Sequence, residues 1–430
     1  MAVKGLYERA CDVMPPVATK RATQLSIVKG KGAYLWDADG KKYLDFASGI
    51  GVTNMGHNHP YVLEKAREQM EKLVHAGHNV VFYPSYVELA EKISESLDNE
   101  YKVYFSNSGA EAVEGAIKLA KWATKRPGII SFKRSFHGRT MGAATVTASS
   151  SLYRREYEGL LPSVYYAEYP YTFRSRLSEE EETERCIQSI KDIFHYLIAP
   201  EKVAAIIMEP VQGEGGYIVP PKIFLEKVRR ICSEHGILLI FDEVQSGFGR
   251  TGQLFAWQNF DVKPDIMCTA KGIANGFPLS AVIGKKEVMD LWTAGAHGGT
   301  FGGNPISCAA GLAVLELLQN GVIDNAQKMG HYFKKQLAKL AASYPVIKDV
   351  RGLGLMIGME CMTEDGKPDS QIIAKLRETA LKKGLLLLSC GVDKNVIRFI
   401  PPLVVTKEEI DFAISVLEES FEEITAKPVH

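Results

Sequence analysis

Lys271 stands in a stretch whose residue types could do chemistry, "PDIMCTAKGIANGFPLSAVIGKK". A short apolar run precedes this lysine, and a turn spelled Gly-Ile-Ala-Asn-Gly-Phe-Pro follows it. Most lysines are solvated surface cations, because an ammonium group is almost never fully buried without a partner. A lysine between a buried strand and a tight turn can instead be a reactive amine. The choice depends on which other reactive groups the chain places near it.

An acidic pair ends a second apolar run, in "GILLIFDEVQSGFGRTG". If this run is a parallel strand, Asp242 lies at the carboxyl edge of the sheet, where open α/β sheets bind ligands. A helix cap, or an ion pair with Arg250, is the structural alternative for this carboxylate. A carboxylate at this edge can also face the protonated nitrogen of a heteroaromatic cofactor.

A third stretch, "YFSNSGAEAVEGAIKLAK", reads as a strand end followed at once by a helix. Such a junction at Ser108, Gly109 and Ala110 presents free backbone N–H groups and the positive end of a helix dipole, which suit a phosphate. A serine-capped turn without a ligand is the alternative. An anion cradle, an acid at a strand end and a reactive lysine together are what pyridoxal phosphate requires.

The elements that must position these groups follow a repeating pattern. In the middle of the chain, short apolar runs alternate with amphipathic stretches, which predicts a mostly parallel sheet with helices on its faces. Before it, "GKGAYLWDADGKKYLDFASG" predicts a hairpin with a turn at residues 38–40. Beyond about residue 315, a long helix, two strand-like segments and a terminal helix predict a smaller α+β domain. We divide the chain into an N-terminal segment (1–60) packed with the small domain, a large cofactor domain (61–315) and a small C-terminal domain (316–430).

Composition excludes several classes of protein. The 430 residues contain 51 basic and 51 acidic residues, so no overall charge indicates a nucleic acid or a membrane partner. Seven scattered cysteines without CxxC spacing argue against a disulfide framework and a structural zinc site. The N-terminus lacks the apolar core of a signal peptide, and we expect a cytoplasmic protein. His57 and His59 lack a third ligand, so we expect no metal site.

Several motifs, in this order, resemble those of the class III aminotransferases: "SFHGRT", "IIMEPVQGEGG", "LIFDEVQSGFGRTG", "CTAKGIANGFPLSAV" and "TFGGNP". The resemblance extends from about residue 20 to the C-terminus. It is strongest to the members that use 4-aminobutyrate, through "SGIGVTNMGHNHP" and "NVIRFIPPL". It implies an α/β protein of fold type I that binds pyridoxal 5'-phosphate. It also implies a homodimer, or a dimer of dimers, with active sites at the subunit interface.

The resemblance also implies roles for particular residues. Lys271 matches the family's Schiff-base lysine, which acts as nucleophile and then as general base, and Asp242 matches the partner of the pyridine nitrogen. Phe136 and His137 occupy the place where the family stacks a ring, most often a tyrosine, on the cofactor. Thr300 matches a phosphate ligand donated by the partner subunit. The remaining cofactor contacts implied are Ser108, Gly109, Ala110, Val244 and Gln245.

Substrate recognition is expected at Ile50, Arg139, Glu209, Glu214 and Arg398. An arginine fork fixes a carboxylate with two parallel hydrogen bonds. Arg139 would hold the distal carboxylate, and Arg398 the α-carboxylate of glutamate. An ω-amino donor has no α-carboxylate, so Glu214 would neutralise Arg398 in that case. Ile50 would supply an apolar wall.

These residues predict transfer of an amino group from an ω-amino acid to 2-oxoglutarate, with 4-aminobutyrate as the leading donor. Acetylornithine and ornithine are alternative donors. A racemase or epimerase on the same scaffold is a second hypothesis, and a cofactor-binding regulatory module without turnover is a third. The intact Lys271 and Asp242 argue against the third. One methylene changes binding by only about 1–3 kcal/mol, so the sequence leaves the length of the donor open.

Overall fold

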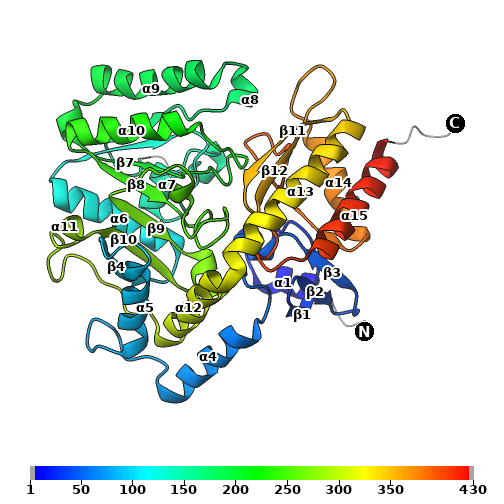
Figure 1. Ribbon diagram of the computed structural model, residues 1–430, viewed down its shortest axis with the longest axis horizontal. Coiled ribbons are helices and arrows are strands. Elements are labelled where there is room, and N and C mark those ends of the chain that lie inside the picture. The colour runs from blue at the N-terminus through cyan, green and yellow to red at the C-terminus, as the bar shows by residue number, and fades with distance from the viewer. Residues whose placement is uncertain (1–4, 158, 426–430) are drawn as a thin grey trace.

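The computed structural model describes residues 5–157 and 159–425, which form three β-sheets and the helices around them (Figure 1). A seven-stranded sheet and its helices form the left-hand part of the view, which we call the large domain. Two four-stranded sheets and the C-terminal helices form the right-hand part, the small domain. The chain is therefore an α/β protein with one large and one smaller unit.

The large sheet has the strand order β4-β10-β9-β8-β7-β5-β6. Its strands are Tyr101–Ser106 (β4), Gly128–Phe132 (β5), Val164–Ala167 (β6), Val203–Met208 (β7), Leu238–Asp242 (β8), Ile266–Thr269 (β9) and Ser280–Lys285 (β10). The neighbours from β6 to β9 are parallel, whereas β10 runs antiparallel to both β9 and β4. The predicted large, mostly parallel sheet is confirmed.

Different helices cover the two faces of this sheet. On β8, Leu239 and Phe241 belong to the apolar cluster that includes residues of α9 and α10, whereas Ile240 belongs to the cluster of α6 and α7. Strands buried on both faces read as continuous apolar runs, which explains "GILLIFD". The covering helices are Gly109–Thr124 (α6), Met141–Val146 (α7), Glu179–Tyr196 (α9) and Lys222–His235 (α10).

The small domain contains two sheets, ordered β1-β2-β3-β13 and β11-β12-β15-β14. The predicted hairpin is confirmed, because β2 and β3 pair antiparallel around a turn in which Gly40 has φ +82°. Strand β3 also pairs in parallel with β13, which joins the N-terminal segment to the C-terminal part of the chain. The strands are Ile27–Lys31 (β1), Tyr34–Asp37 (β2), Lys42–Asp45 (β3), Ile347–Leu353 (β11), Met356–Cys361 (β12), Leu385–Leu386 (β13), Leu388–Cys390 (β14) and Val396–Phe399 (β15).

Three helices complete the small domain: Ile323–Ser343 (α13), Ser370–Lys382 (α14) and Lys407–Thr425 (α15). The long and the terminal helix expected from the sequence are α13 and α15. The shorter elements are Leu6–Val13 (α1), Pro16–Thr19 (α2), Ser48–Gly51 (α3), Ser151–Tyr153 (η1), Thr172–Ser175 (α8), Pro200–Lys202 (η2), Ala256–Asn259 (η3), Lys271–Ala274 (η4) and Lys286–Met289 (α11).

One helical run among the described residues, Pro305–Ser343, is long and apolar enough by composition to cross a membrane. It consists of α12 (Pro305–Leu317), the π-helical turn η5 (Leu318–Val322) and α13. Helix α12 packs against α4 (Pro60–Lys72) and α5 (Pro84–Glu95), and most of its residues are buried. Burial in the protein core accounts for its apolar composition.

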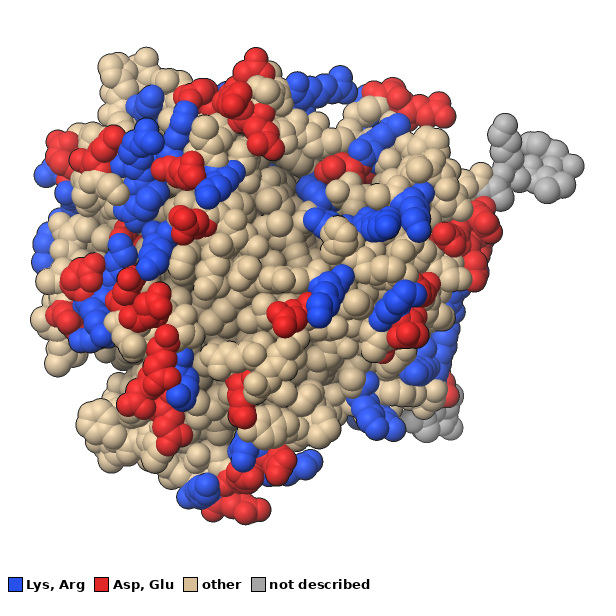
Figure 2. Space-filling view, in the orientation of Figure 1, with Lys and Arg blue, Asp and Glu red and all other residues tan. Residues whose placement is uncertain are grey.

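The surface in Figure 2 carries both signs of charge. Lysine and arginine side chains alternate with aspartate and glutamate over this face, and neither sign forms a broad patch on it. The middle of the face, between the two domains, is hollowed and largely uncharged.

Arg250 ties three parts of the chain together in the core. Its buried Nη1 donates to the carbonyl oxygens of Leu355, at 3.1 Å, and Pro401, at 2.6 Å. Its Nη2 donates to Asn54 Oδ1 at 2.7 Å. Asn54 packs on Gly272, where an added Cβ would lie 2.2 Å from Nδ2, so only glycine fits there. Arg250 therefore helps to fix the turn that follows β9.

Candidate active site

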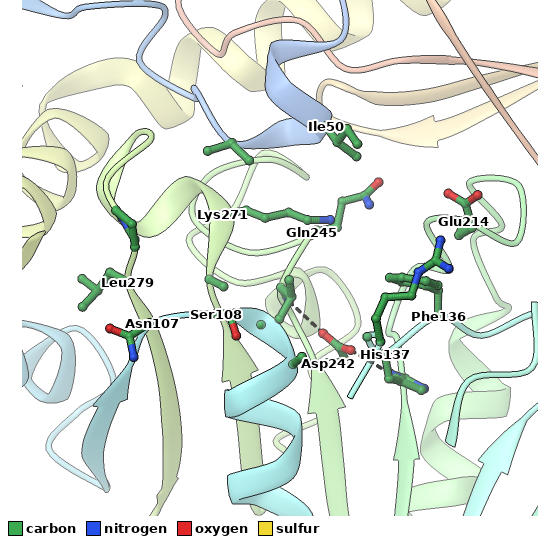
Figure 3. Close-up of a pocket in the computed structure, with 18 of the residues that line it drawn as sticks. Ile50, Asn107, Ser108, Phe136, His137, Glu214, Asp242, Gln245, Lys271 and Leu279 are labelled. Carbon is green, nitrogen blue, oxygen red and sulfur yellow. Dashed lines mark hydrogen bonds and ion pairs between the residues drawn. The ribbon is translucent and has the colours of Figure 1, made fainter. Parts of the chain in front are cut away.

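A cavity opens at the carboxyl ends of the parallel strands, between the two domains (Figure 3). It gathers residues that lie more than 300 positions apart in the chain, from Ile50 to Arg398. The predicted residues that line it are Ile50, Ser108, Gly109, Ala110, Phe136, His137, Arg139, Glu209, Glu214, Asp242, Val244, Gln245, Lys271 and Arg398. The exposed Thr300 is the one predicted residue that does not line it.

Lys271 follows β9 by two residues and begins the turn η4. Its φ of +48° is left-handed, a strained conformation for a lysine that aims the side chain into the cavity (Figure 3). Burial, reinforced by the positive charge of Arg398, lowers the pKa of Lys271 to about 8. About a tenth of this amine is then unprotonated at pH 7, far more than for a lysine with the usual pKa, and the unprotonated form is the one that a nucleophile or a base requires. An ordinary solvated lysine would not have this property.

Asp242 ends β8 and lies at the floor of the cavity, with 4% of its surface exposed. Its Oδ2 is 2.7 Å from His137 Nδ1, and its Oδ1 accepts a hydrogen bond from Val244 N at 3.0 Å. The structural alternative of an ion pair between Asp242 and Arg250 is wrong, because Arg250 binds carbonyl groups and Asn54 elsewhere. The contacts that fix Asp242 leave it facing the cavity (Figure 3).

The N-terminus of α6 forms the third wall. Ser108 caps the helix by accepting from Glu111 N, and the Glu111 carboxylate accepts from the backbone N–H groups of Asn107 and Ser108, each at 2.8 Å. Gly109 and Ala110 occupy the first two helical positions, whose N–H groups have no intrahelical partner. A Cβ on Gly109 would lie 2.9 Å from Val244 Cγ1, so glycine lets the helix end approach the cavity floor. These two N–H groups suit a phosphate.

Phe136 and His137 have different surroundings. The Phe136 ring lines the cavity and meets Tyr153 edge to face, with centroids 5.3 Å apart. The His137 side chain is buried and points to Asp242, and its Nε2 makes no hydrogen bond to any described residue. Phe136 therefore provides a ring surface, while His137 holds Asp242 from below.

Arg398 and Glu214 meet across the domain boundary. Arg398 Nη1 donates to Glu214 Oε2 at 2.9 Å, and the Arg398 side chain is 8% exposed. Burial lowers the pKa of Arg398, but the charge and hydrogen bond of Glu214, together with Tyr217 and Cys390, raise it by more, so the pKa is raised overall. Tyr153 OH donates to the other Glu214 oxygen at 3.2 Å. The carboxylate is thus held by two groups while it neutralises the arginine.

Arg139 contrasts with Arg398. Its guanidinium stacks over the Tyr153 ring at 3.9 Å and forms no ion pair with any described residue. It is exposed at the cavity wall, where its fork is available to a carboxylate.

Glu209 has a different environment from that expected of a substrate ligand. Its two oxygens accept from Phe136 N at 2.9 Å and Gly213 N at 2.7 Å. Burial, with a further contribution from the negative charge of Asp242, raises the pKa of Glu209 to about 7. Glu209 lines the cavity, yet both oxygens already hold backbone loops, so its contacts are those of a positioning residue.

Gln245 and Ile50 lie on the upper side of the cavity in Figure 3. Gln245 Oε1 makes no hydrogen bond to any described residue although it is buried. Ile50 is 46% exposed with φ +70°, because the short helix α3 is kinked at Gly49 and Ile50. This left-handed kink presents the Ile50 side chain at the mouth of the cavity.

Several lining residues were missed by sequence reasoning. Tyr153 stands in "SSLYRREYEG", where no periodicity distinguishes it, and only its contacts with Arg139 and Glu214 reveal its place. The others lie within the quoted motifs but were not assigned a role there: Val52, Asn107, Gly138, Ala270, Gly276, Phe277, Pro278 and Leu279.

No cluster of three or more His, Cys, Asp or Glu side chains within residues 5–157 and 159–425 is arranged to hold a metal. His57 Nε2 lies 2.8 Å from the buried Asp45 Oδ2, so this histidine has a partner within the small domain.

The residues present fit pyridoxal phosphate. A near-neutral amine, a buried carboxylate and a helix N-terminus with two free N–H groups meet in one cavity, with the Phe136 ring beside them. Sheet and site together define a pyridoxal-phosphate-dependent transferase of fold type I.

The chain belongs to the aminotransferase class-III family, whose model matches residues 17–421. It is 42% identical to the probable 4-aminobutyrate aminotransferase of Bacillus subtilis, with 91% of each chain covered. It is 37% identical to the alanine/serine racemase of Pyrococcus horikoshii, with 98% of this chain and 90% of that protein covered. A PLP-bound amine transaminase from an uncultivated Pseudomonas species matches with TM-score 0.88 and 32% identity, over 96% and 97% of the two chains. The protein is a class III aminotransferase that uses pyridoxal 5'-phosphate, an amino donor and a keto acid acceptor.

Proposed function

We propose that this enzyme transfers the amino group of an ω-amino acid to 2-oxoglutarate, with 4-aminobutyrate as the leading donor. The observation that carries the proposal is the Arg398–Glu214 ion pair of 2.9 Å inside the cavity, which also contains an Arg139 without a carboxylate partner among the described residues. One arginine is neutralised and the other is free, so the cavity matches a substrate that carries a single carboxylate.

The same residues account for two different substrates. Arg139 binds the carboxylate of the ω-amino donor, while Glu214 stays on Arg398 and spares the donor a buried, unpaired charge beside its methylene chain. Glutamate brings a second carboxylate, which replaces Glu214 on Arg398. The half-buried Glu214 has room to leave, because part of its side chain is exposed to the cavity.

The cofactor supplies an electron sink for the carbon that loses its proton. Lys271 Nζ, with its pKa lowered to about 8, is the base that takes this proton and returns it. The Asp242 carboxylate lies at the cavity floor, where His137 fixes its orientation. Phe136 and Val244 supply apolar surface to the cavity lining.

The proposal also covers the oligomeric state of the protein and its place in the cell. Thr300 lies on an exposed loop beside Phe301, which is 64% exposed, and a partner subunit's cavity is a suitable place for both. We therefore propose a homodimer in which Thr300 contacts the phosphate of the neighbouring site. All seven cysteines are free, which fits a reducing cytoplasm.

If Thr300 contributes to the partner's site, cofactor affinity and dimerisation are linked by mass action. Thr300→Val should lower cofactor retention several-fold, about the effect of one lost hydrogen bond, and the dimer should dissociate more readily after the cofactor is removed. Light scattering and cofactor dialysis measure the two effects. A fully active monomer would rule out the shared site.

A donor panel tests the proposed activity. The donors are 4-aminobutyrate, 5-aminovalerate, ornithine, acetylornithine and alanine, each with 2-oxoglutarate and with pyruvate as acceptor. The ω-amino donors with 2-oxoglutarate should give the largest kcat/KM values. If α-amino donors exceed all ω-amino donors, the proposal is wrong.

Racemisation is the second candidate, favoured by the 37% identity to a racemase over nearly the whole chain. A chiral assay of alanine and serine without a keto acid separates the two activities. The second arginine with its removable partner, Arg398 with Glu214, favours transamination, because a racemase substrate such as alanine never brings the second carboxylate that this pair would accept.

A further inference from the structure

The loop that carries Glu214, residues 212–218, is closed on itself. The backbones of Gln212 and Ile218 exchange two hydrogen bonds, of 3.0 and 3.1 Å, at its base. The N–H groups of Gly216 and Tyr217 donate to the Gly213 carbonyl within it. The loop extends from the large domain toward the small domain, and its tip must be held in place for Glu214 to meet Arg398.

Two groups of the small domain hold this tip by its backbone. Gly391 N donates to the carbonyl of Glu214 at 2.9 Å. Arg351 donates to the carbonyl of Gly216 twice, from Nε at 3.0 Å and from Nη2 at 2.6 Å. A Cβ on Gly216 would lie 3.2 Å from Arg351 Nη2, and its φ is +127°, so glycine permits this close approach. We call the double contact of Arg351 with the Gly216 carbonyl the clamp.

A buried carboxylate fixes Arg351 in turn. Glu360, on β12, is fully buried and accepts from Arg351 Nη1 at 2.7 Å and from Tyr171 OH. Tyr171 OH also accepts from Arg351 Nη2 at 2.8 Å. The other Glu360 oxygen accepts from Arg174 Nε at 2.7 Å and Asn395 Nδ2 at 3.1 Å. Because every oxygen is occupied, the guanidinium has one well-defined orientation.

The sheet that carries the clamp also carries Arg398. Strand β12 pairs with β15, where Gly358 faces Arg398 and Glu360 faces Val396. Strand β11, with Arg351, pairs with the other edge of β12. Figure 1 shows β11 and β12 on the side of the small domain that faces the large domain. Arg398 and the clamp therefore belong to one rigid unit.

We propose that Arg351, oriented by Glu360, is a positioning residue that sets donor specificity. It holds the loop of residues 212–218 where the Glu214 side chain can pair with Arg398. The clamp grips only backbone, so the Glu214 side chain is free to leave Arg398 when a second carboxylate enters, while the loop itself stays in place. The exchange between the two substrates is then a movement of one side chain. This inference rests on the proposed function, because it concerns the same carboxylate exchange.

Arg351→Lys tests the proposal. Lysine keeps a positive charge near Glu360 but loses the fork that reaches the Gly216 carbonyl. For the 4-aminobutyrate half-reaction, the single-turnover rate constant divided by the apparent dissociation constant should fall about tenfold or more, because the contact between Glu214 and Arg398 is weakened. For the glutamate half-reaction the same ratio should change by about threefold or less. Single-turnover absorbance of the loaded enzyme measures each half. Amide hydrogen exchange should increase in peptide 212–218 and not in α6.

Arg229→Lys is the matched control. Arg229 also pairs with a largely buried acid, Asp265, at 2.7 Å, but it lies on α10 and does not contact the loop. It should leave the ratio of the two half-reactions unchanged. Tyr171→Phe is a milder second variant, which removes the hydroxyl that contacts both Arg351 and Glu360 and should change the ratio in the same direction. If Arg351→Lys does not fold, this variant alone decides the outcome.

A double variant separates positioning from general stability. If Arg351 acts through Glu214, adding Arg351→Lys to Glu214→Gln should change the donor half-reaction by less than about twofold. Additive losses, or equal losses in both half-reactions, overturn the proposal. Failure of wild-type enzyme to react with any ω-amino donor would instead overturn the proposed function. If the proposed function fails in this way, hydrogen exchange still tests the positioning role of Arg351. Unchanged exchange in peptide 212–218 of Arg351→Lys would contradict that role, and increased exchange there would support it.

Discussion

The cofactor side and the substrate side of the cavity are built differently. Asp242, Lys271 and the N-terminus of α6 all belong to the large domain and stand at the edge of one sheet. On the substrate side, Arg398 comes from the small domain and Glu214 from a loop of the large domain, and a single ion pair joins them. The groups proposed to hold the cofactor are fixed by the core of one domain, whereas the ion pair proposed to open between substrates joins two domains.

The largest effect should come from the cofactor side. Lys271→Ala removes the base, and turnover should fall by at least about ten-thousandfold, although the cofactor can still bind at α6 and Asp242. Borohydride treatment of wild-type enzyme should attach the cofactor to the peptide that contains Lys271, as mass spectrometry would show. Lys121→Ala, outside the cavity, serves as the control. Labelling of another lysine would refute the assignment.

Asp242→Asn should reduce kcat by about a hundredfold to a thousandfold, because a preorganised charge is removed while the shape is kept. The asparagine can still contact His137, so cofactor content should change little. Both half-reactions should slow equally, since the charge serves both. A variant slowed in only one half-reaction would contradict the division between the two sides.

The substrate side should respond selectively. Arg398→Ala should impair the glutamate half-reaction by about tenfold to a hundredfold and the 4-aminobutyrate half-reaction much less. Glu214→Ala should do the reverse, because Arg398 is then uncovered when the donor binds. Single-turnover spectroscopy measures each half separately.

Arg139→Ala is the internal control for the Arg398→Ala and Glu214→Ala variants. It should impair both half-reactions, because both substrates are expected to place a carboxylate at Arg139. If Arg398→Ala and Glu214→Ala each impair the two halves equally, the ion pair is only structural.

The smallest effect concerns pH. A lysine whose pKa is lowered to about 8 loses its proton as the pH rises through that value, whereas an ordinary lysine loses it only around pH 10.5. The rate of cofactor uptake by apoprotein should therefore rise by about tenfold from one pH unit below this value to one unit above it, and then level off. Stopped-flow absorbance measures the rate. A continued tenfold rise per unit up to pH 10 would show an unperturbed amine.

Much of the cofactor side could be predicted from the sequence. Apolar runs that end in Asp242, or just before Lys271, indicate buried parallel strands, and the edge of such a sheet is where ligands bind. The predicted contacts gather in one cavity because neighbouring parallel strands align their carboxyl ends. The antiparallel direction of β10 was not predicted, since its apolar pattern is the same in either direction.

The remaining details depend on contacts between distant segments. The His137–Asp242 bond joins residues 105 positions apart, and Tyr153 reaches Glu214 across 61 positions. Glu209 was expected at the substrate, but its oxygens hold backbone N–H groups, which no local pattern reveals. The structure also places Thr300 outside this cavity, and its role in a partner's site stays a prediction.

We expect the buried Arg250 to delay formation of the active site in a newly made chain. Its acceptors come from Asn54, Leu355 and Pro401, and a guanidinium buried without them is strongly destabilising. A nascent chain that has left the ribosome only as far as the large domain lacks two of these three acceptors. The turn after Lys271, which packs on Asn54, can then settle only after the C-terminal sheet has been synthesised. Catalytic competence is thus acquired late in translation, and cofactor attachment to ribosome-bound chains that end before Pro401 would disprove this order.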